Sequence, residues 1–143
     1  MNEGAFVSVP IAGLVWFSTN VEAQPAKELY ELQERCSKRA AETFQREYSH
    51  VSNSKHGRLF SYESHYSARL DKCFFLEISV AYEKGQSTGH KLMRLFDLDD
   101  NKEYGQYFMN DLYQVGPFPC DVQGKICRSE SEWRQLLEPF MED

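Results

Sequence analysis

Apolar residues recur every three or four positions between Pro25 and Tyr48. The positions that carry this period are Leu29, Leu32, Cys36, Ala40, Phe44 and Tyr48. This spacing places them on one face of a helix of about six turns. Proline is favoured in the first turn of a helix, and the opposite face carries pairs of opposite charges four residues apart, such as Glu31 and Arg35. The pattern predicts a long N-terminal helix that packs on another layer through its apolar face.

After Gly57 the apolar period changes from that of a helix to that of a strand. Alternation predicts strands over 59–66, 74–82, 91–98 and 104–109. Polar turn formers at 83–89 and 99–102 separate the last three of these strands. The pattern therefore indicates an antiparallel sheet of about four strands.

A second, shorter helix is predicted near the C-terminus. Ser129 and Glu132 have the spacing of a capping box, and the apolar residues Trp133, Leu136, Leu137 and Phe140 follow on one face. Pro139 is expected to end or kink this helix. The order helix, antiparallel strands, helix predicts an α+β domain over residues 24–143, with the long helix across one face of the sheet.

Composition and charge limit the classes of function that fit this chain. The chain has 143 residues, of which 41% are hydrophobic and 14% aromatic, and this suits one globular domain. Its formal net charge of −6 argues against binding to nucleic acids or anionic membranes, because both require clustered Lys and Arg. No basic cluster is present in the sequence.

The first 23 residues have the pattern of a signal peptide. An apolar run extends from Phe6 to Phe17, shorter than the about 20 residues that a membrane-spanning helix needs. Val21 and Ala23 suit cleavage after Ala23, which would leave a mature chain that begins at Gln24. The basic residues that usually precede such a run are missing, so a buried N-terminal strand at 6–9 is the alternative.

Four cysteines, Cys36, Cys73, Cys120 and Cys127, all follow this segment. An even number in an exported domain predicts two disulfides, for which three connectivities exist. The short segment between Cys120 and Cys127 contains Gln123-Gly124, which can reverse the chain, so we favour Cys120 with Cys127 and Cys36 with Cys73. No pair has the spacing of a zinc site, and we expect no metal or other cofactor.

Asp97, Asp99 and Asn101 alternate in a way that suggests oxygen ligands for calcium. An EF-hand loop requires glycine at its sixth position and glutamate at its twelfth, where this chain has Lys102 and Phe108. A hairpin turn is the better interpretation of this segment.

Glu63 and His65 are the candidate catalytic residues. They share one face of the first predicted strand, while Tyr62 and Tyr66 share the other. A carboxylate beside a histidine could act as a tuned general base. The competing interpretation places the tyrosines in the core and leaves Glu63 and His65 on a solvated face.

An aromatic group near the last strand is the candidate binding surface. It consists of Tyr104, Tyr107, Phe108, Tyr113 and Phe118. Tyrosine-rich patches are common at protein interfaces. Packing in the core would also explain these residues.

Three segments carry a resemblance to other proteins. At 36–40, 65–74 and 130–133 the chain resembles small exported bacterial proteins of uncharacterised function. The resemblance covers residues from Glu28 to Met141 and includes an H-Y-x-x-x-L-x-K-C-F segment and a late cysteine pair. It implies a shared fold and export, but no particular activity.

The hypothesis from the sequence is a periplasmic or secreted, disulfide-stabilised binding module, whose partner is an envelope protein or a small ligand. The alternative is a small periplasmic hydrolase or isomerase that uses His65 and Glu63. A third possibility is a cytoplasmic domain with four reduced thiols.

Overall fold

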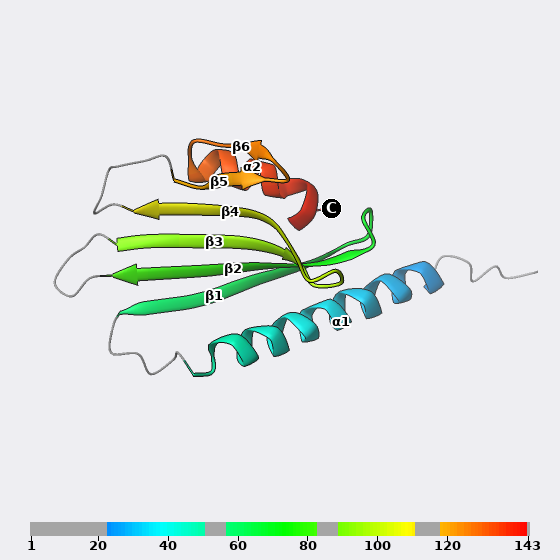
Figure 1. The fold of residues 1–143 in the computed structure, drawn as a ribbon. Coiled ribbons are helices and arrows are strands. Elements are labelled where there is room, and N and C mark those ends of the chain that lie inside the picture. Colours follow the sequence, from blue (N-terminus) through cyan, green and yellow to red (C-terminus); the bar gives the residue numbers. More distant parts are fainter. Residues whose placement is uncertain (1–22, 51–56, 83–88, 111–117, 143) are drawn as a thin grey trace, which may run out of the picture.

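The computed structural model describes residues 23–50, 57–82, 89–110 and 118–142, with side chains from Pro25 onward (Figure 1). Within these ranges the fold is α+β, with a long N-terminal helix, an antiparallel sheet and a short C-terminal helix, as predicted. The predicted signal peptide over 1–23 lies outside the described residues, apart from Ala23. The predicted turn at 83–88 and the candidate binding residue Tyr113 also lie outside them.

The long helix, α1, extends from Ala23 to Tyr48. Its apolar face contains the predicted positions: Cys36 and Ala40 are buried, and Leu29, Leu32, Phe44 and Tyr48 are partly buried. The helix packs against the first two strands and runs along that side of the sheet (Figure 1). The helical period of the sequence therefore identified both the element and its inward face.

In the part of the chain that the structure describes, the sheet has six strands in sequential order, and all neighbours are antiparallel. The strands are β1 (Arg58–Ser67), β2 (Lys72–Tyr82), β3 (Gly89–Asp97), β4 (Lys102–Asn110), β5 (Cys120–Val122) and β6 (Lys125–Ile126). The first four correspond to the predicted strands. β5 and β6 were not predicted as strands, because segments of three and two residues are too short to show alternation. The predicted chain reversal between them is confirmed: Gln123 and Gly124 have φ of 51° and 78°, as in the tight turns favoured in hairpins.

The C-terminal helix, α2, extends from Glu130 to Met141 and begins with the predicted cap. The Ser129 hydroxyl accepts a hydrogen bond from the Glu132 N–H at 3.1 Å. The Glu132 carboxylate in turn accepts from the Arg128 N–H at 2.7 Å. Pro139 does not end the helix, which continues to Met141.

The two helices cover opposite faces of the sheet. Successive residues of β2 point to alternate faces, so that one set faces α1 and the other set faces α2. On the α2 face the core consists of Phe74, Leu76, Met93, Leu95, Tyr107, Val122, Cys127, Trp133 and Leu137. On the α1 face, Cys36, Tyr66 and Cys73 form a second cluster. Beside it, a row of aromatic contacts joins α1 to β1 and β2 through Phe44, Tyr48, Phe60, Tyr62 and Phe75. The sheet thus carries one core on each face.

Both favoured disulfides are present. Cys36 in α1 is bonded to Cys73 in β2, with 5.4 Å between their Cα atoms. Cys120 in β5 is bonded to Cys127, with 5.1 Å between Cα atoms. Two disulfides in a small domain indicate an oxidising compartment outside the cytoplasm. Neither helix in the described ranges has the length and apolar character needed to cross a membrane.

Candidate functional site

The candidate residues Glu63 and His65 both lie on the α2 face of β1. Their cross-strand partners on β2 are Leu76 and Phe74, which belong to the core under α2. The carboxylate of Glu63 lies 3.9 Å from the guanidinium of Arg134 in α2. The face that carries them is therefore partly covered by a helix, whereas Tyr62 and Tyr66 face α1.

A groove of about 570 Å³, called here the α2 groove, lies between α2 and the β1 side of the sheet. The residues that define it are Glu63, Leu76, Glu130, Arg134, Leu137 and Glu138. The side chains of Leu76 and Leu137 are buried and form an apolar floor, while Glu63 and Glu138 are exposed at the rim. The groove can thus accept an apolar stem below and a charged or polar group above.

Ion pairs organise one wall of the α2 groove. The Glu130 carboxylate lies 2.6 Å from the Lys91 ammonium and 3.3 Å from Nε of Arg134. Burial alone would raise the pKa of Glu130, but Lys91 and Arg134 outweigh it and hold the pKa below its usual value. Arg134 is therefore shared between Glu130 and the more distant Glu63. With Glu138 and Glu142 also along the groove, carboxylates outnumber the single guanidinium of its lining.

A smaller cavity of about 240 Å³ lies between the C-terminal half of α1 and the strands β2 and β3. Nη2 of Arg94 donates to both carboxylate oxygens of Glu77 at 2.9 Å, and only 8% of the Glu77 side chain is exposed. Burial and a hydrogen bond with Glu77 raise the pKa of Tyr48 at the end of α1. Burial tends to lower the pKa of Arg94, but Glu77 raises it overall. The three groups pair with one another, apart from Nε of Arg94, which is buried without a hydrogen-bond partner among the described residues, and they tie the end of α1 to the sheet.

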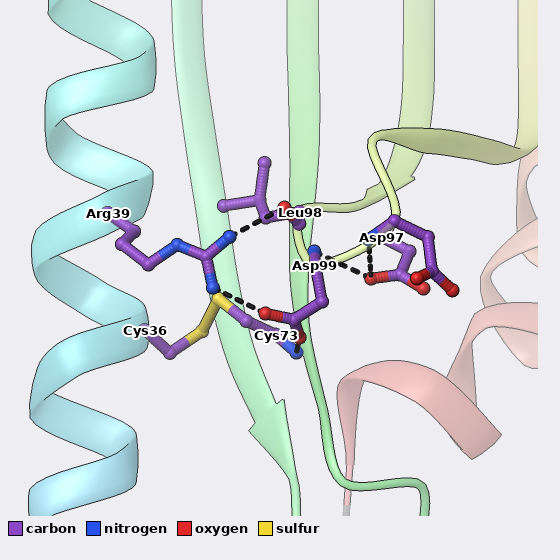
Figure 2. The surroundings of a disulfide bond; sticks show 7 residues. Cys36, Arg39, Cys73, Asp97, Leu98 and Asp99 are labelled. Carbon is purple, nitrogen blue, oxygen red and sulfur yellow. Dashed lines mark hydrogen bonds and ion pairs between the residues drawn. A yellow bond between two sulfur atoms is a disulfide. The ribbon is translucent and has the colours of Figure 1, made fainter.

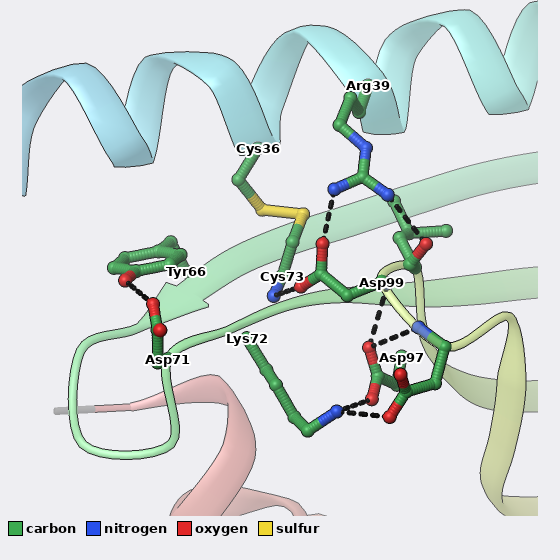
Figure 3. A network of polar contacts seen from close by, with 10 residues as sticks. Cys36, Arg39, Tyr66, Asp71, Lys72, Cys73, Asp97 and Asp99 are labelled. Carbon is green, nitrogen blue, oxygen red and sulfur yellow. Dashed lines mark hydrogen bonds and ion pairs between the residues drawn. A yellow bond between two sulfur atoms is a disulfide. The ribbon is translucent and has the colours of Figure 1, made fainter.

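The turn between β3 and β4 is held by the buried carboxylate of Asp97 (Figures 2 and 3). One oxygen accepts from the N–H groups of Asp99 at 2.8 Å and Asp100 at 3.3 Å, and the other accepts from the Lys72 ammonium. Burial alone would raise the pKa of Asp97, but these donors lower it below the usual value. The hairpin turn predicted for this segment is present, and its buried carboxylate is engaged by the protein's own donors.

The same turn is joined to α1 next to the disulfide (Figure 2). Arg39, one turn after Cys36, pairs with the carboxylate of Asp99 and donates to the Leu98 carbonyl at 2.6 Å. The second oxygen of Asp99 accepts from the N–H of Cys73 at 2.8 Å. Across the described ranges, no group of three or more His, Cys, Asp or Glu side chains is placed to hold a metal ion.

Tyr66 also has a structural role on this side of the sheet (Figure 3). Its hydroxyl donates to Asp71 at 2.5 Å, in the turn between β1 and β2. This hydrogen bond, together with burial, raises the pKa of Tyr66 to about 12. Tyr66 therefore remains a neutral donor that holds the turn.

The aromatic candidates are divided between the two faces of the sheet. Tyr107 is buried against Trp133, with 6.0 Å between ring centroids, and Tyr104 belongs to the same α2 core. Phe108 follows Tyr107 in β4, so it faces the other side, where it contacts Phe118 at 5.4 Å. The described members of this group do not form one continuous surface.

No protein-family model matches the chain, and no significant match is found among curated proteins or among solved structures. The function is therefore inferred from the protein's own residues and geometry. Sequence reasoning singled out Glu63 but not the α2 residues that face it. The spacing of Glu130, Arg134 and Glu138, four residues apart, was the signal that these side chains share one helix face.

Proposed function

We propose that this protein is a periplasmic or secreted, disulfide-stabilised binding module, and that the α2 groove is its binding site. The observation that carries the proposal is the groove itself. It combines a buried apolar floor with exposed carboxylates and lies beside the edge of the sheet. Binding sites typically combine an apolar lining with a few polar groups that orient the ligand.

Export is supported by three independent features. The two disulfides favour an oxidising compartment. The apolar run from Phe6 to Phe17 has the length of a signal-peptide core. The resemblance to small exported bacterial proteins agrees with both features.

Binding, rather than catalysis, is favoured by how the charges in the groove are used. Glu63 and Glu130 both lie near Arg134, and Glu130 also pairs with Lys91. A general base needs access to the proton it removes and a pKa suited to the transfer. The excess of exposed carboxylates, Glu63 and Glu138 among them, is better suited to binding a partner of opposite charge.

Site-specific photocrosslinking in the native host tests the binding site. A photoreactive amino acid would replace Gln135, which is exposed in the α2 groove, and in a matched control Gln33, which is exposed on α1. We expect a defined adduct in the intact mass at Gln135 and not at Gln33. The absence of an adduct at Gln135, or the same adducts at both positions, would overturn the proposal.

Intact mass and thiol titration of the protein from that host test its export. We expect a chain that begins near Gln24 and has no free thiols. A full-length chain with four free thiols would contradict export and return the protein to the cytoplasm.

A further inference from the structure

We infer that the partner of this module is an extended, basic peptide segment, which adds to the sheet beside β1 and places a Lys or Arg side chain in the α2 groove. This inference rests on the proposed function and specifies the chemistry of its partner. Two features carry it: the open edge of β1, and the position of Glu63 between that edge and α2.

β1 is an edge strand with the length and regularity needed to pair with a further strand. Among the residues that the structure describes, it stands at one end of the sheet order and pairs with β2 alone, without a register shift over Arg58–Ser67. In an antiparallel pair, alternate residues direct their N–H and C=O groups away from the partner strand. Edge strands are commonly protected by proline, by a bulge or by short length, and β1 has none of these.

Glu63 sets the position at which an added strand would meet the groove. It lies near the middle of β1, opposite Leu76, and its side chain is 53% exposed. A residue directly across from Glu63 on an added strand would have its Cβ about 5 Å away, on the same face. That side chain would lie beside Glu63, at the rim of the α2 groove that Glu138 also lines.

The groove favours a long basic side chain at this position. Lys and Arg bury their methylene stems on apolar surface while they keep the charged group at a polar rim. The exposed carboxylates of Glu63 and Glu138 suit the charge, and this charge complementarity carries the preference, because Leu76 and Leu137 are only 1% and 3% exposed and offer the stem little surface. Arg134 does not saturate Glu63, because their 3.9 Å separation exceeds the length of a direct hydrogen bond.

Charge also argues for a partner other than a second copy of this chain. Pairing of β1 with β1 of another molecule would bring two carboxylate-rich grooves together. Like charges directly opposite one another on paired strands are destabilising. The proposed mature chain from Gln24 lacks Glu3 and Glu22 and so has a formal net charge of 16 − 20 = −4, which adds to this repulsion and favours a basic partner.

A binding assay with a designed probe tests the inference on the oxidised protein. The probe is a fluorescently labelled, soluble peptide of about ten residues, rich in threonine and valine, with one central lysine. There are two control peptides. One has glutamate in place of that lysine, and the other has N-methyl groups on the amide nitrogens along both edges of the strand, which removes their N–H donors. Binding is measured by fluorescence anisotropy at low and at high salt.

The protein variants separate local from general electrostatics. Glu63→Lys changes the groove, and Glu34→Lys makes the same charge change on the exposed surface of α1. We expect Glu63→Lys to weaken binding about tenfold and Glu34→Lys to leave it within about twofold. We also expect both control peptides to lose binding, and salt to weaken binding of the lysine peptide. Circular dichroism checks that both variants remain folded.

Two results would overturn the inference. Equal binding of the N-methylated peptide would show that no strand is added. Equal effects of Glu63→Lys and Glu34→Lys on binding would show that the groove does not recognise the charge of the lysine. Either result together with an adduct at Gln135 would leave the proposed binding site standing, with a partner of different chemistry. Dimers that dissociate on Glu63→Lys substitution would assign the edge to a second copy instead.

Discussion

Replacing Cys36 and Cys73 together by alanine measures how much the protein depends on the bridge between α1 and β2. The matched comparison replaces Cys120 and Cys127, which close a much shorter loop. The sequence separations are 37 and 7 residues. In the loop-entropy treatment these closures correspond to about 3.8 and about 2.4 kcal/mol of stability. The longer bridge should therefore cost more when it is lost.

Packing losses affect both pairs, because Cys36, Cys73 and Cys127 are all buried. The difference between the two variants is thus more informative than either loss alone. Urea unfolding followed by circular dichroism gives the free energy of unfolding of each variant, with a slope that reports the surface exposed. We expect the variant without the Cys36–Cys73 bridge to be less stable by about 1.5 kcal/mol than the variant without the Cys120–Cys127 bridge.

The reasoning would be refuted if the short bridge contributed as much as the long one. An equal loss would mean that the Arg39 contacts with Asp99 and Leu98 already hold α1 against the sheet without the disulfide. Reduction of the variant without Cys120 and Cys127 provides a second comparison, because it breaks only the Cys36–Cys73 bond and retains its sulfur atoms. Matching losses on reduction and on substitution would assign the effect to the cross-link rather than to packing.

Three further substitutions test other parts of the structure. Asp97→Asn should cost about 2 kcal/mol by weakening the pair with Lys72, measured by urea unfolding. Because the folded-state pKa of Asp97 is lowered, its contribution to the free energy of unfolding is complete above the unfolded pKa near 4 and is lost as pH falls through the lower folded value. The stability of the Asp97→Asn variant should therefore depend less on pH in acid. Gly105→Ala should cost about 2 kcal/mol and loosen the pairing of β4 with β5, seen as faster hydrogen exchange, because its Cβ would lie 2.5 Å from the Asp121 carbonyl oxygen. Trp133→Phe should destabilise the fold by about 3 kcal/mol and lower the melting temperature, since the indole of Trp133 is fully buried and its N–H donates to the Asp121 carbonyl at 3.2 Å. An unchanged melting temperature would contradict the central place of Trp133 in the core.

Much of the fold could be predicted from the sequence because its signals are local. The period of the apolar residues identified α1 and the first four strands, with ends within two residues of those observed. The spacing of Ser129 and Glu132 identified the start of α2. The short segment with Gln123-Gly124 favoured the correct partner for Cys120 and thereby for Cys36.

The tertiary structure decided which of these elements meet. Glu63 could be assigned to a face of its strand from alternation, but its position beside Arg134 depends on where α2 crosses that face. Tyr48, Glu77 and Arg94 come from three elements, and no spacing relates them. The sequence around Tyr107 does not show whether its ring is buried in the core or lies on a binding surface.

For this protein, then, the sequence alone indicated α1, the first four strands, α2 and their inward faces, and it favoured the disulfide pairing that is observed, because hydrophobic period, turn residues and caps act over a few neighbouring positions. The tertiary structure determined the strands β5 and β6, the side of the sheet that α2 covers and the α2 groove with its edge strand. The physical reason is that these features arise from pairing and burial between segments far apart in the chain. Such contacts form only when the whole sheet is assembled.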